Sequence, residues 1–447
     1  MRPFCCGMMI AVCLVLVSGT QVHSGPIRVA TFNASLNRNQ QGDLVADLSN
    51  PGGTTGRILH IKTVAEIIQR IDADVILINE FDYVANNQAI DLFRSNFLQQ
   101  SQNVFGIGAT APLTYQFAFT APSNTGVASG YDLNNNGAVV TLPGTPGYGD
   151  DALGFGNFEG QFGMAVFSKL PILESQVRTF QKFLWKDMPG ARLPDDPSTA
   201  TPADWYSTEE LAVFRLSSKS HWDVPVQVGS SVLHVLASHP TPPVFDGPED
   251  RNGRRNADEI RFWRDYVDGM AYIYDDNGGL GGLAANSRFV IAGDMNSDPN
   301  DGDSVPGAIQ QLLNGPMISN SFTPSSLGAT QQSSLQGGKN LTHLSDPRYD
   351  TADFADNNPG NLRADYVLPS VFGIHTLGGG VFWPANTDPL FPLVGTFNTS
   401  NFWAGFPSSD HRPVFVDLEM VPEPSSSVLT ACAGAIFAVV ALRRRAT

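Results

Sequence analysis

The sequence predicts one mixed α/β domain, and three observations support this prediction. Segments with helical and with strand spacing alternate at the start of the chain, strand-like segments dominate afterwards, and no Pro-, Gly- or Ser-rich linker divides the body. The 447 residues show no repeat, and one large α/β domain can accommodate this length. With 42% hydrophobic and 10% aromatic residues, the composition indicates a folded protein rather than a disordered one.

The first elements alternate strand and helix. Residues 26–33 are rich in β-branched and aromatic side chains and predict a strand that ends at Asn33, followed by a polar, Gly-rich loop over 35–55. Apolar side chains recur at helical spacing over residues 57–71, which predicts an amphipathic helix. The apolar run 75–78 predicts a buried strand that ends at Asn79 and Glu80.

Strands and loops make up most of the remaining prediction. Helices are expected only at 88–99 and 256–270. The expected strands are residues 163–172, 231–237, 288–292, 362–368 and 414–418. The expected irregular segments are residues 101–160, which include short strands, and residues 191–207 and 298–359.

The two ends of the chain carry targeting patterns. Residues 1–24 combine an early arginine, a short apolar run and small polar residues, which predicts a secretory signal peptide. Residues 421–447 contain Pro-Glu-Pro, an apolar run and three arginines, and this tail resembles the C-terminal sorting signals of Gram-negative bacteria. In that class an exosortase-type enzyme removes the tail at the cell envelope. The alternative is a plain transmembrane tail anchor.

These patterns place the functional body at residues 25–420. They imply an exported protein of the cell envelope or extracellular matrix of a Gram-negative-type bacterium, with the export machinery and an exosortase-type sorting enzyme as partners. The formal net charge is −16, and the two ends contain four of the arginines, so the body is more acidic still. Proteins that grip nucleic acid through its phosphates are usually basic, so no stable nucleic-acid complex is expected.

The four cysteines all lie in the two terminal segments. The body therefore has neither a disulfide framework nor a thiolate metal site, and any metal there must bind oxygen or histidine ligands. Polar side chains follow the predicted strands at the point where loops begin, and active sites gather at such strand ends. They are Asn33, Glu80, His239, Asp294, Asn296, Asp365, Asp410 and His411.

Oxygen ligands dominate this set, which suits a hard divalent cation: Mg²⁺ first, with Mn²⁺ or Ca²⁺ as alternatives. Mg²⁺ chemistry with few carboxylates points to hydrolysis of phosphate esters by an activated water. Asp294 and Asn296 are two positions apart, so in an extended strand both would face one pocket while Met295 points into packing.

The motifs TFN, INE, SHP, GDMN, ADYVLPS and SSDHRPV, in this order, resemble the endonuclease/exonuclease/phosphatase superfamily. That superfamily includes pancreatic-type deoxyribonuclease, abasic-site endonucleases, neutral sphingomyelinases and inositol-polyphosphate 5-phosphatases. The resemblance runs from about residue 27 to residue 419. It implies an α+β fold, a four-layer α/β/β/α sandwich with two mainly antiparallel sheets.

The resemblance also implies roles for the strand-end residues. Asn33, Glu80 and Asp410 match the metal ligands, while Asp294 and Asn296 match the residues that align the attacking water and bind the phosphoryl oxygens.

The two histidines match acid–base positions. His411, with one ring nitrogen bonded to Asp365, would stabilise transition-state charge or transfer a proton, and His239 would lie near the leaving group. One departure is that family nucleases often carry glutamine before the metal-binding glutamate, where this chain has Asn79.

Basic residues near His239 are candidates for phosphate binding. Arg251, Arg254 and Arg255 cluster in an otherwise acidic chain, and Lys219 lies near an expected strand end. Arginine binds phosphate in a bidentate manner. The alternative is an ion-paired surface loop, because acidic residues flank the arginines.

Together these observations predict a secreted, monomeric, divalent-metal-dependent phosphoesterase that acts on phosphate mono- or diesters. An extracellular endonuclease or exonuclease on DNA or RNA is the alternative. A second alternative is a non-catalytic surface-matrix protein on the same fold.

Overall fold

The computed structural model describes residues 25–396 and 407–421. The predicted signal peptide and, apart from Val421, the predicted sorting tail lie outside the described residues, so both stay predictions. Within these two ranges no helix is both long enough and apolar enough to span a bilayer.

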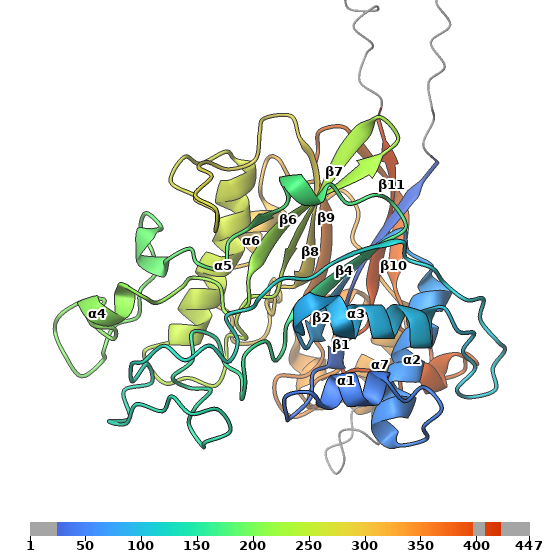
Figure 1. Ribbon diagram of the computed structural model, residues 1–447, viewed down its shortest axis with the longest axis horizontal. Coiled ribbons are helices and arrows are strands. Elements are labelled where there is room, and N and C mark those ends of the chain that lie inside the picture. Colours follow the sequence, from blue (N-terminus) through green and yellow to red (C-terminus); the bar gives the residue numbers. More distant parts are fainter. Residues whose placement is uncertain (1–24, 397–406, 422–447) are drawn as a thin grey trace, which may run out of the picture.

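Two β-sheets form the centre of the molecule (Figure 1). The six-stranded sheet has the order β10 (Ile374–Val381), β11 (Val414–Met420), β1 (Ile27–Leu36), β2 (Val75–Phe81), β4 (Met164–Ser168), β3 (Phe117–Phe119). The five-stranded sheet has the order β5 (Arg178–Thr179), β6 (His221–Val228), β7 (Ser231–Ser238), β8 (Arg288–Asp294), β9 (Asp365–Pro369). Among the described strand pairs, β1–β2 and β7–β8 are parallel and the others are antiparallel.

Helices cover the outer faces of the two sheets. Helices α1 (Asp43–Leu48), α2 (Gly56–Ile71) and α3 (Gln88–Phe93) lie beside the six-stranded sheet, and α5 (Arg251–Val267) and α6 (Gln310–Leu313) lie beside the five-stranded sheet (Figure 1). The remaining α-helices are α4 (Thr208–Leu211) and α7 (Leu327–Gln336). A π-helical turn follows α3 at Arg94–Leu98. The 3₁₀ turns are Ala85–Asn87, Glu174–Gln176, Trp185–Asp187, Gly338–Thr342, Pro347–Tyr349 and Phe391–Leu393.

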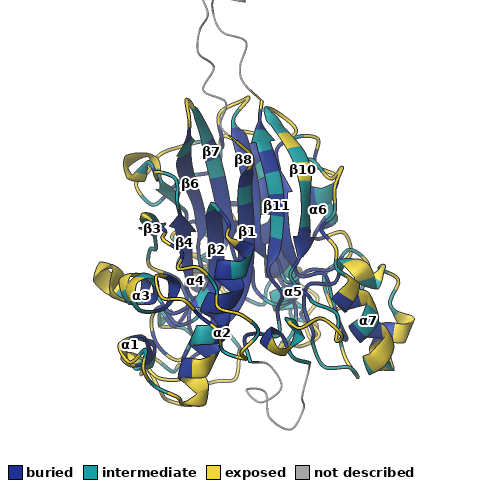
Figure 2. Cartoon of the chain, turned by 90° about the vertical axis from the view of Figure 1, so that its right-hand side faces the viewer, coloured by how far each residue is buried: buried dark blue, intermediate teal, exposed yellow. Residues whose placement is uncertain are grey.

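Three layers of apolar side chains hold the four layers of backbone together. The isoleucines of α2 pack on the outer face of the six-stranded sheet, and the aromatic face of α5 packs on the outer face of the five-stranded sheet. Between the sheets, side chains such as Leu77, Trp222 and Val235 are fully buried. The central strands are buried over most of their length (Figure 2). This arrangement confirms the predicted α+β four-layer sandwich with two mainly antiparallel sheets.

Most predicted elements are present, with shifted ends. Helix α2 begins after Thr55, whose hydroxyl accepts from the Ile58 amide, and ends at Asp72 in the left-handed conformation. Helix α5 begins at Arg251, before the predicted residue 256, so the arginine cluster lies on a helix and not in a loop. Strands β6 and β10 and helices α1 and α7 were not predicted. Glycines interrupt β10, α1 has only six residues, and α7 lies within residues 298–359, which were expected to be mostly loop.

Candidate active site

The predicted strand-end residues meet at one rim of the sandwich. Asn33 lies in β1, and Glu80 lies near the end of the neighbouring strand β2. On the other sheet Asp294 ends β8 and pairs in register with Asp365, the first residue of β9. His239 directly follows β7, and Asp410 and His411 precede β11. Both sheets therefore contribute to one constellation.

Asp294 is the centre of this constellation. Its Oδ2 accepts a hydrogen bond of 3.0 Å from the Asn33 amide and lies 3.5 Å from Nε2 of His239 and 3.6 Å from Nε2 of His411. Nδ1 of His411 lies 2.9 Å from Oδ2 of Asp365. Asp294 is therefore held between two imidazoles, one of which is oriented by a second carboxylate, as the resemblance implied.

The two histidines have opposite electrostatic environments. Burial alone would lower the pKa of His411, but the carboxylates of Asp365, Asp294 and Asp410 outweigh burial and raise this pKa well above its ordinary value. Burial, with the positive charges of Lys219 and His411, lowers the pKa of His239 well below its ordinary value. His411 is therefore a charged imidazolium and His239 a neutral imidazole at neutral pH.

The pKa of Asp294 is also shifted. Its burial raises its pKa above the ordinary value, and the charge of His411 counters this effect. A carboxylate with a raised pKa is a better proton acceptor than an ordinary surface aspartate, which suits a group that activates water.

Of the three predicted cation ligands, Glu80 and Asp410 present carboxylate oxygens, whereas Asn33 presents its side-chain nitrogen to Glu80 and its oxygen accepts from the Ser35 backbone amide. The side-chain amide of Asn33 donates to Oε1 of Glu80 at 3.1 Å. Burial and the nearby charge of Asp410 raise the pKa of Glu80 to about 7. Two carboxylates that repel each other at a half-buried rim are a donor set that a hard cation would stabilise, because the cation replaces their repulsion by attraction.

A second group of possible ligands comprises Asp294, Asp365 and His411, whose candidate ligand atoms lie within 4.8 Å of one another. The hydrogen bond between Nδ1 of His411 and Asp365 leaves Nε2 of a neutral ring available to a metal, whereas protonation of that ring removes its lone pair. Glu80 and Asp410, the ligands predicted from the sequence, are the alternative candidates for a cation.

Asn79 connects the two sheets directly beneath the site. Its Oδ1 accepts from the Asp294 amide and from the Thr31 hydroxyl, and its Nδ2 donates to the Ser238 carbonyl, all at 3.3 Å. The backbones of β7 and β8 approach so closely here that a Cβ on Gly293 would lie 2.0 Å from the Ser238 carbonyl oxygen. Asn79 therefore links the two sheets next to Glu80, and the close approach of the strands requires glycine at the position before Asp294.

Asn296 lies in the predicted pocket, but the reason given for this position, an extended strand that continues through Asn296, was wrong. Strand β8 ends at Asp294, and Asn296 lies in the left-handed conformation with φ 50°. The backbone amide of Asn296 donates to Oδ1 of Asp294 at 2.9 Å, and this bond closes a tight turn. Asp294 and Asn296 still line the same cavity, and Met295 is fully buried.

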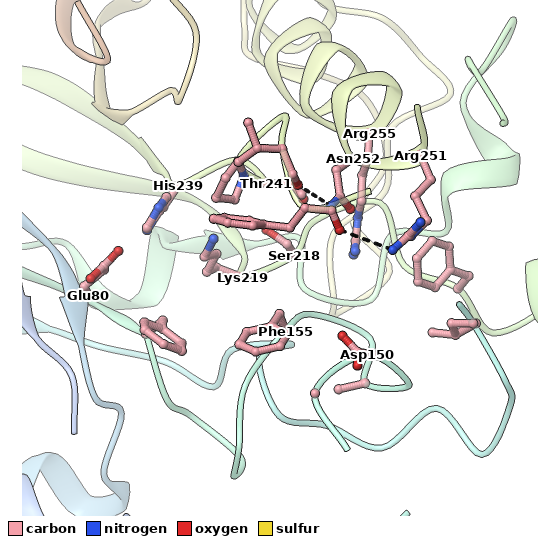
Figure 3. Close-up of a pocket in the computed structure, with 18 of the residues that line it drawn as sticks. Glu80, Asp150, Phe155, Ser218, Lys219, His239, Thr241, Arg251, Asn252 and Arg255 are labelled. Carbon is pink, nitrogen blue, oxygen red and sulfur yellow. Dashed lines mark hydrogen bonds between the residues drawn. The ribbon is translucent and has the colours of Figure 1, made fainter. Parts of the chain in front are cut away.

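Two cavities open next to each other at this rim. The acidic cavity, of about 440 Å³, is lined by Glu80, Asp294, Asp298, Asp303, Asp410 and His411 among others. The aromatic cavity, of about 500 Å³, is lined by Phe155, Phe162, Tyr206, Phe214, Phe245 and Lys219 among others. Glu80, His239 and Phe245 line both cavities, so the aromatic cavity, drawn in Figure 3, adjoins the constellation of strand-end residues.

The predicted phosphate-binding residues differ in their placement. Lys219 lines the aromatic cavity near His239, and among the described residues no carboxylate lies within ion-pair distance of its ammonium group. Arg251 and Arg255 line the far end of the same cavity. Arg254 is not among the described residues that line either cavity.

Two of the three arginines, Arg251 and Arg255, are already engaged in the protein. Arg251 forms an ion pair with Glu249, as the surface-loop alternative proposed. Arg255 is buried and donates to the carbonyls of Leu216 at 2.8 Å, Leu153 at 2.6 Å and Arg215 at 2.9 Å. Of the four basic candidates, Lys219 is therefore the one best able to meet a phosphate.

Sequence reasoning missed the residues that support the constellation. The Thr351 hydroxyl donates to Oδ2 of Asp365 at 2.8 Å, and the ring of Phe354 packs edge-on against His411 with centroids 5.3 Å apart. The Ser409 hydroxyl donates to the Asn33 carbonyl at 2.7 Å and accepts from the His411 amide at 3.1 Å. Ser409 stands inside the SSDHRPV motif, but Thr351 and Phe354 lie in a segment expected to be mostly loop and have no pattern of their own.

The sequence profile of the Endonuclease/Exonuclease/phosphatase family matches residues 30–411. The chain belongs to this family. Its members are generally metal-dependent hydrolases of phosphate esters. No curated protein matches the chain.

Solved structures resemble the chain at low sequence identity. An endonuclease/exonuclease/phosphatase family protein from Leptotrichia buccalis is 11% identical, with 88% of this chain and 100% of that chain covered and a TM-score of 0.42. Sphingomyelinase C from Streptomyces griseocarneus is 13% identical, with 88% and 99% covered and a TM-score of 0.38. A Staphylococcus aureus beta toxin mutant with bound magnesium ions is 12% identical, with 89% and 100% covered and a TM-score of 0.40.

Proposed function

We propose that the protein is a divalent-metal-dependent phosphoesterase that hydrolyses phosphate mono- or diesters. The observation that carries this proposal is the pairing of two half-buried carboxylates, Glu80 and Asp410, with the buried Asp294–His411–Asp365 chain at the mouth of one cavity. Family membership supports the same reaction class.

In this proposal each group has a defined task. Glu80 and Asp410 hold a divalent cation, Mg²⁺ first and Mn²⁺ or Ca²⁺ as alternatives, and Asn33 orients Glu80 by donating to its Oε1. A bound cation would neutralise the negative charge on the phosphoryl oxygens. Asp294 accepts the proton of the attacking water, and its Oδ2 is kept in position by the Asn33 amide.

The remaining groups act on the phosphate and the leaving group. The His411 imidazolium, fixed by Asp365, stabilises the charge that develops on the phosphoryl oxygens. Asn296 binds a phosphoryl oxygen from the same cavity wall. Neutral His239 and the Lys219 ammonium lie on the side that opens to the aromatic cavity, next to the leaving group.

The shape of the site favours small esters over duplex DNA. The two cavities hold about 440 and 500 Å³, which is the size of a small-molecule pocket, and the chain is acidic overall. A nuclease acting on polymeric DNA or RNA is therefore the second candidate. A non-catalytic matrix protein would not need the Asp294–His411–Asp365 arrangement.

The test is hydrolysis of bis(p-nitrophenyl) phosphate by the purified protein with and without Mg²⁺, Mn²⁺, Ca²⁺ or a chelator. Asp294→Asn and His411→Gln should each lower kcat/KM by a factor of about 10² to 10⁴. The matched control is His234→Gln, because His234 forms a similar pair with Asp223 at 2.8 Å but lines neither cavity. Metal-independent turnover, or equal rates in all three variants, would refute the proposal.

We further propose export through the predicted signal peptide and exosortase-type removal of the tail, and a monomeric protein. Cell fractionation, with mass spectrometry of the two termini of the recovered protein, tests the first two points. Recovery of a full-length chain from the cytoplasm would contradict them.

A further inference from the structure

A glutamate of helix α5 fixes the two segments that carry Lys219 and His239. The carboxylate of Glu259 accepts two hydrogen bonds of 2.6 Å, from the backbone amide of Ser218 to Oε1 and from the backbone amide of Thr241 to Oε2. Ser218 directly precedes Lys219, and Thr241 lies two residues after His239. One fully buried side chain therefore bonds to both segments from which Lys219 and His239 reach the cavity (Figure 3).

A second buried side chain of the same helix extends this support. Asn256 lies three residues before Glu259, and its Nδ2 donates to the carbonyl of Thr241 at 2.8 Å and to the carbonyl of Met295 at 2.9 Å. Met295 directly follows Asp294. Because these bonds join three segments to one helix, they fix the relative positions of groups that are far apart in the sequence.

The backbone around Lys219 is also held from other directions. A Cβ on Gly154 would lie 1.9 Å from the Ser218 carbonyl oxygen, so this segment packs directly against another stretch of backbone. The Lys219 carbonyl accepts from the Asn124 amide at 2.8 Å. The Lys219 side chain is buried in the cavity wall, and its position is therefore set by the protein before any ligand binds.

The Glu259 carboxylate also opposes the effect of burying a positive charge. Burial lowers the pKa of the Lys219 ammonium, and the charge of Glu259 is the largest of the effects that oppose burial. Glu80 and Asp294 act in the same direction as Glu259, and Arg255 acts against them. Glu80 and Asp294 face the acidic cavity, where a cation and a proton would change their charge, whereas Glu259 lines neither cavity. Glu259 is therefore the counter-charge that stays constant when a ligand binds.

We propose that Glu259 is a positioning residue for Lys219, which holds the loop in place and keeps the ammonium group charged for contact with phosphate. This inference rests on the proposed phosphoesterase function and adds a residue that touches neither the substrate nor the cation. Because Glu259 acts through Lys219, removal of the Lys219 charge must also remove the effect of Glu259 on phosphate binding.

The test is a double-mutant cycle of Glu259→Gln and Lys219→Met, with inorganic phosphate as the probe. Calorimetric titration of the purified proteins in Mg²⁺ gives the four dissociation constants. Glu259→Gln should weaken phosphate binding about three- to tenfold when Lys219 is present, and less than about twofold in the Lys219→Met background. The effect with Lys219 present should be larger at pH 9 than at pH 6, because the ammonium loses its proton more readily without its counter-charge. Glu80, Asp294 and His239, the other titratable neighbours, are common to all four proteins.

Glu66→Gln is the matched control for the loss of a buried glutamate. Glu66 is also fully buried on a helix, accepts from the Val104 backbone amide at 2.7 Å and lines neither cavity. Its substitution should leave phosphate affinity unchanged. If circular dichroism shows that Glu259→Gln does not fold, Glu259→Asp replaces it in the cycle. The shorter side chain keeps the charge but cannot bond to both amides, and its effect should likewise vanish in the Lys219→Met background.

Three results would overturn the inference. They are equal effects of the Glu259 substitution with and without Lys219, wild-type phosphate affinity in the Glu259 variant, and no phosphate binding by the wild-type protein. Hydrolysis of bis(p-nitrophenyl) phosphate, measured on the same samples, separates this inference from the proposed function. Metal-dependent turnover with additive effects in the cycle refutes the positioning role alone, whereas a coupled cycle without any turnover refutes the phosphoesterase alone.

Discussion

The burial of Glu80, next to Asp410, makes the stability of the metal-free protein depend on pH. Glu80 has a pKa raised from its ordinary value of 4.5 to about 7, mainly by burial and then by Asp410. Folding therefore disfavours its ionised form by about 3 kcal/mol, an upper value because part of the side chain reaches solvent. The penalty is absent below pH 4.5, where the carboxyl is protonated in both states, and fully present above pH 7.

Glu80→Gln removes this charge and keeps the shape of the side chain. Without metal, the variant should be more stable than the wild-type protein at pH 8, by up to about 3 kcal/mol, and about equally stable near pH 4.5. Mg²⁺ at 100 times its dissociation constant should stabilise the wild-type protein by about 2.7 kcal/mol and the variant by much less.

Urea denaturation at several pH values, with Mg²⁺ and with a chelator, measures both effects. Glu174→Gln is the matched control, because Glu174 is exposed and lines neither cavity, and it should behave as the wild-type protein. A Glu80→Gln variant that is no more stable at pH 8, or that gains as much from Mg²⁺ as the wild-type protein, would show that Glu80 is not a cation ligand.

Three further predictions follow from the site. Asp365→Asn should lower kcat/KM near pH 7 by a factor of about 10² to 10⁴, because it removes the charge bonded to His411; in kinetics from pH 5 to 9 the loss should be smallest at low pH, where the imidazole is still protonated. Lys219→Met should raise KM for a phosphate ester by a factor of about 10 to 100 through the loss of one charge-assisted hydrogen bond, and an unchanged KM would contradict its role. Asn79→Ala should lower the free energy of unfolding by about 2–4 kcal/mol, because the Asp294 amide and the Ser238 carbonyl lose a partner; an unchanged urea midpoint would contradict this.

The strand ends of the site were predictable because apolar runs define the strands. Strands β1 and β2 are parallel neighbours, so the polar residues at their ends, Asn33 and Glu80, arrive side by side. Strands β8 and β9 are paired so that Asp294 lies opposite Asp365. An apolar run in the sequence indicates a buried strand, so the polar residue that ends the run lies at the rim of the sandwich.

The cavities were not predictable in the same way. Phe155 and Phe245 come from irregular segments without periodicity, and only the folded chain brings them to Glu80. The arginine cluster shows the opposite problem. Its pattern suggested a phosphate site, but the Arg255 guanidinium donates to the carbonyls of Leu153, Arg215 and Leu216, which belong to two different segments. A cluster of charged residues in the sequence does not reveal whether those side chains already form bonds within the folded protein.

Five of the twelve described non-glycine residues with positive φ lie at this rim. Ser35, Glu80, Phe162, Phe245 and Asn296 all have φ between 48° and 68°, and each lines at least one of the two cavities. Such conformations cost about 1 kcal/mol or more each for residues other than glycine, so local preference alone would not select them. The packed sheets and the Asn79 bridge must hold them in place. Strained backbone and neighbouring carboxylates therefore occur together at Glu80, which lines both cavities and is a ligand of the proposed cation site.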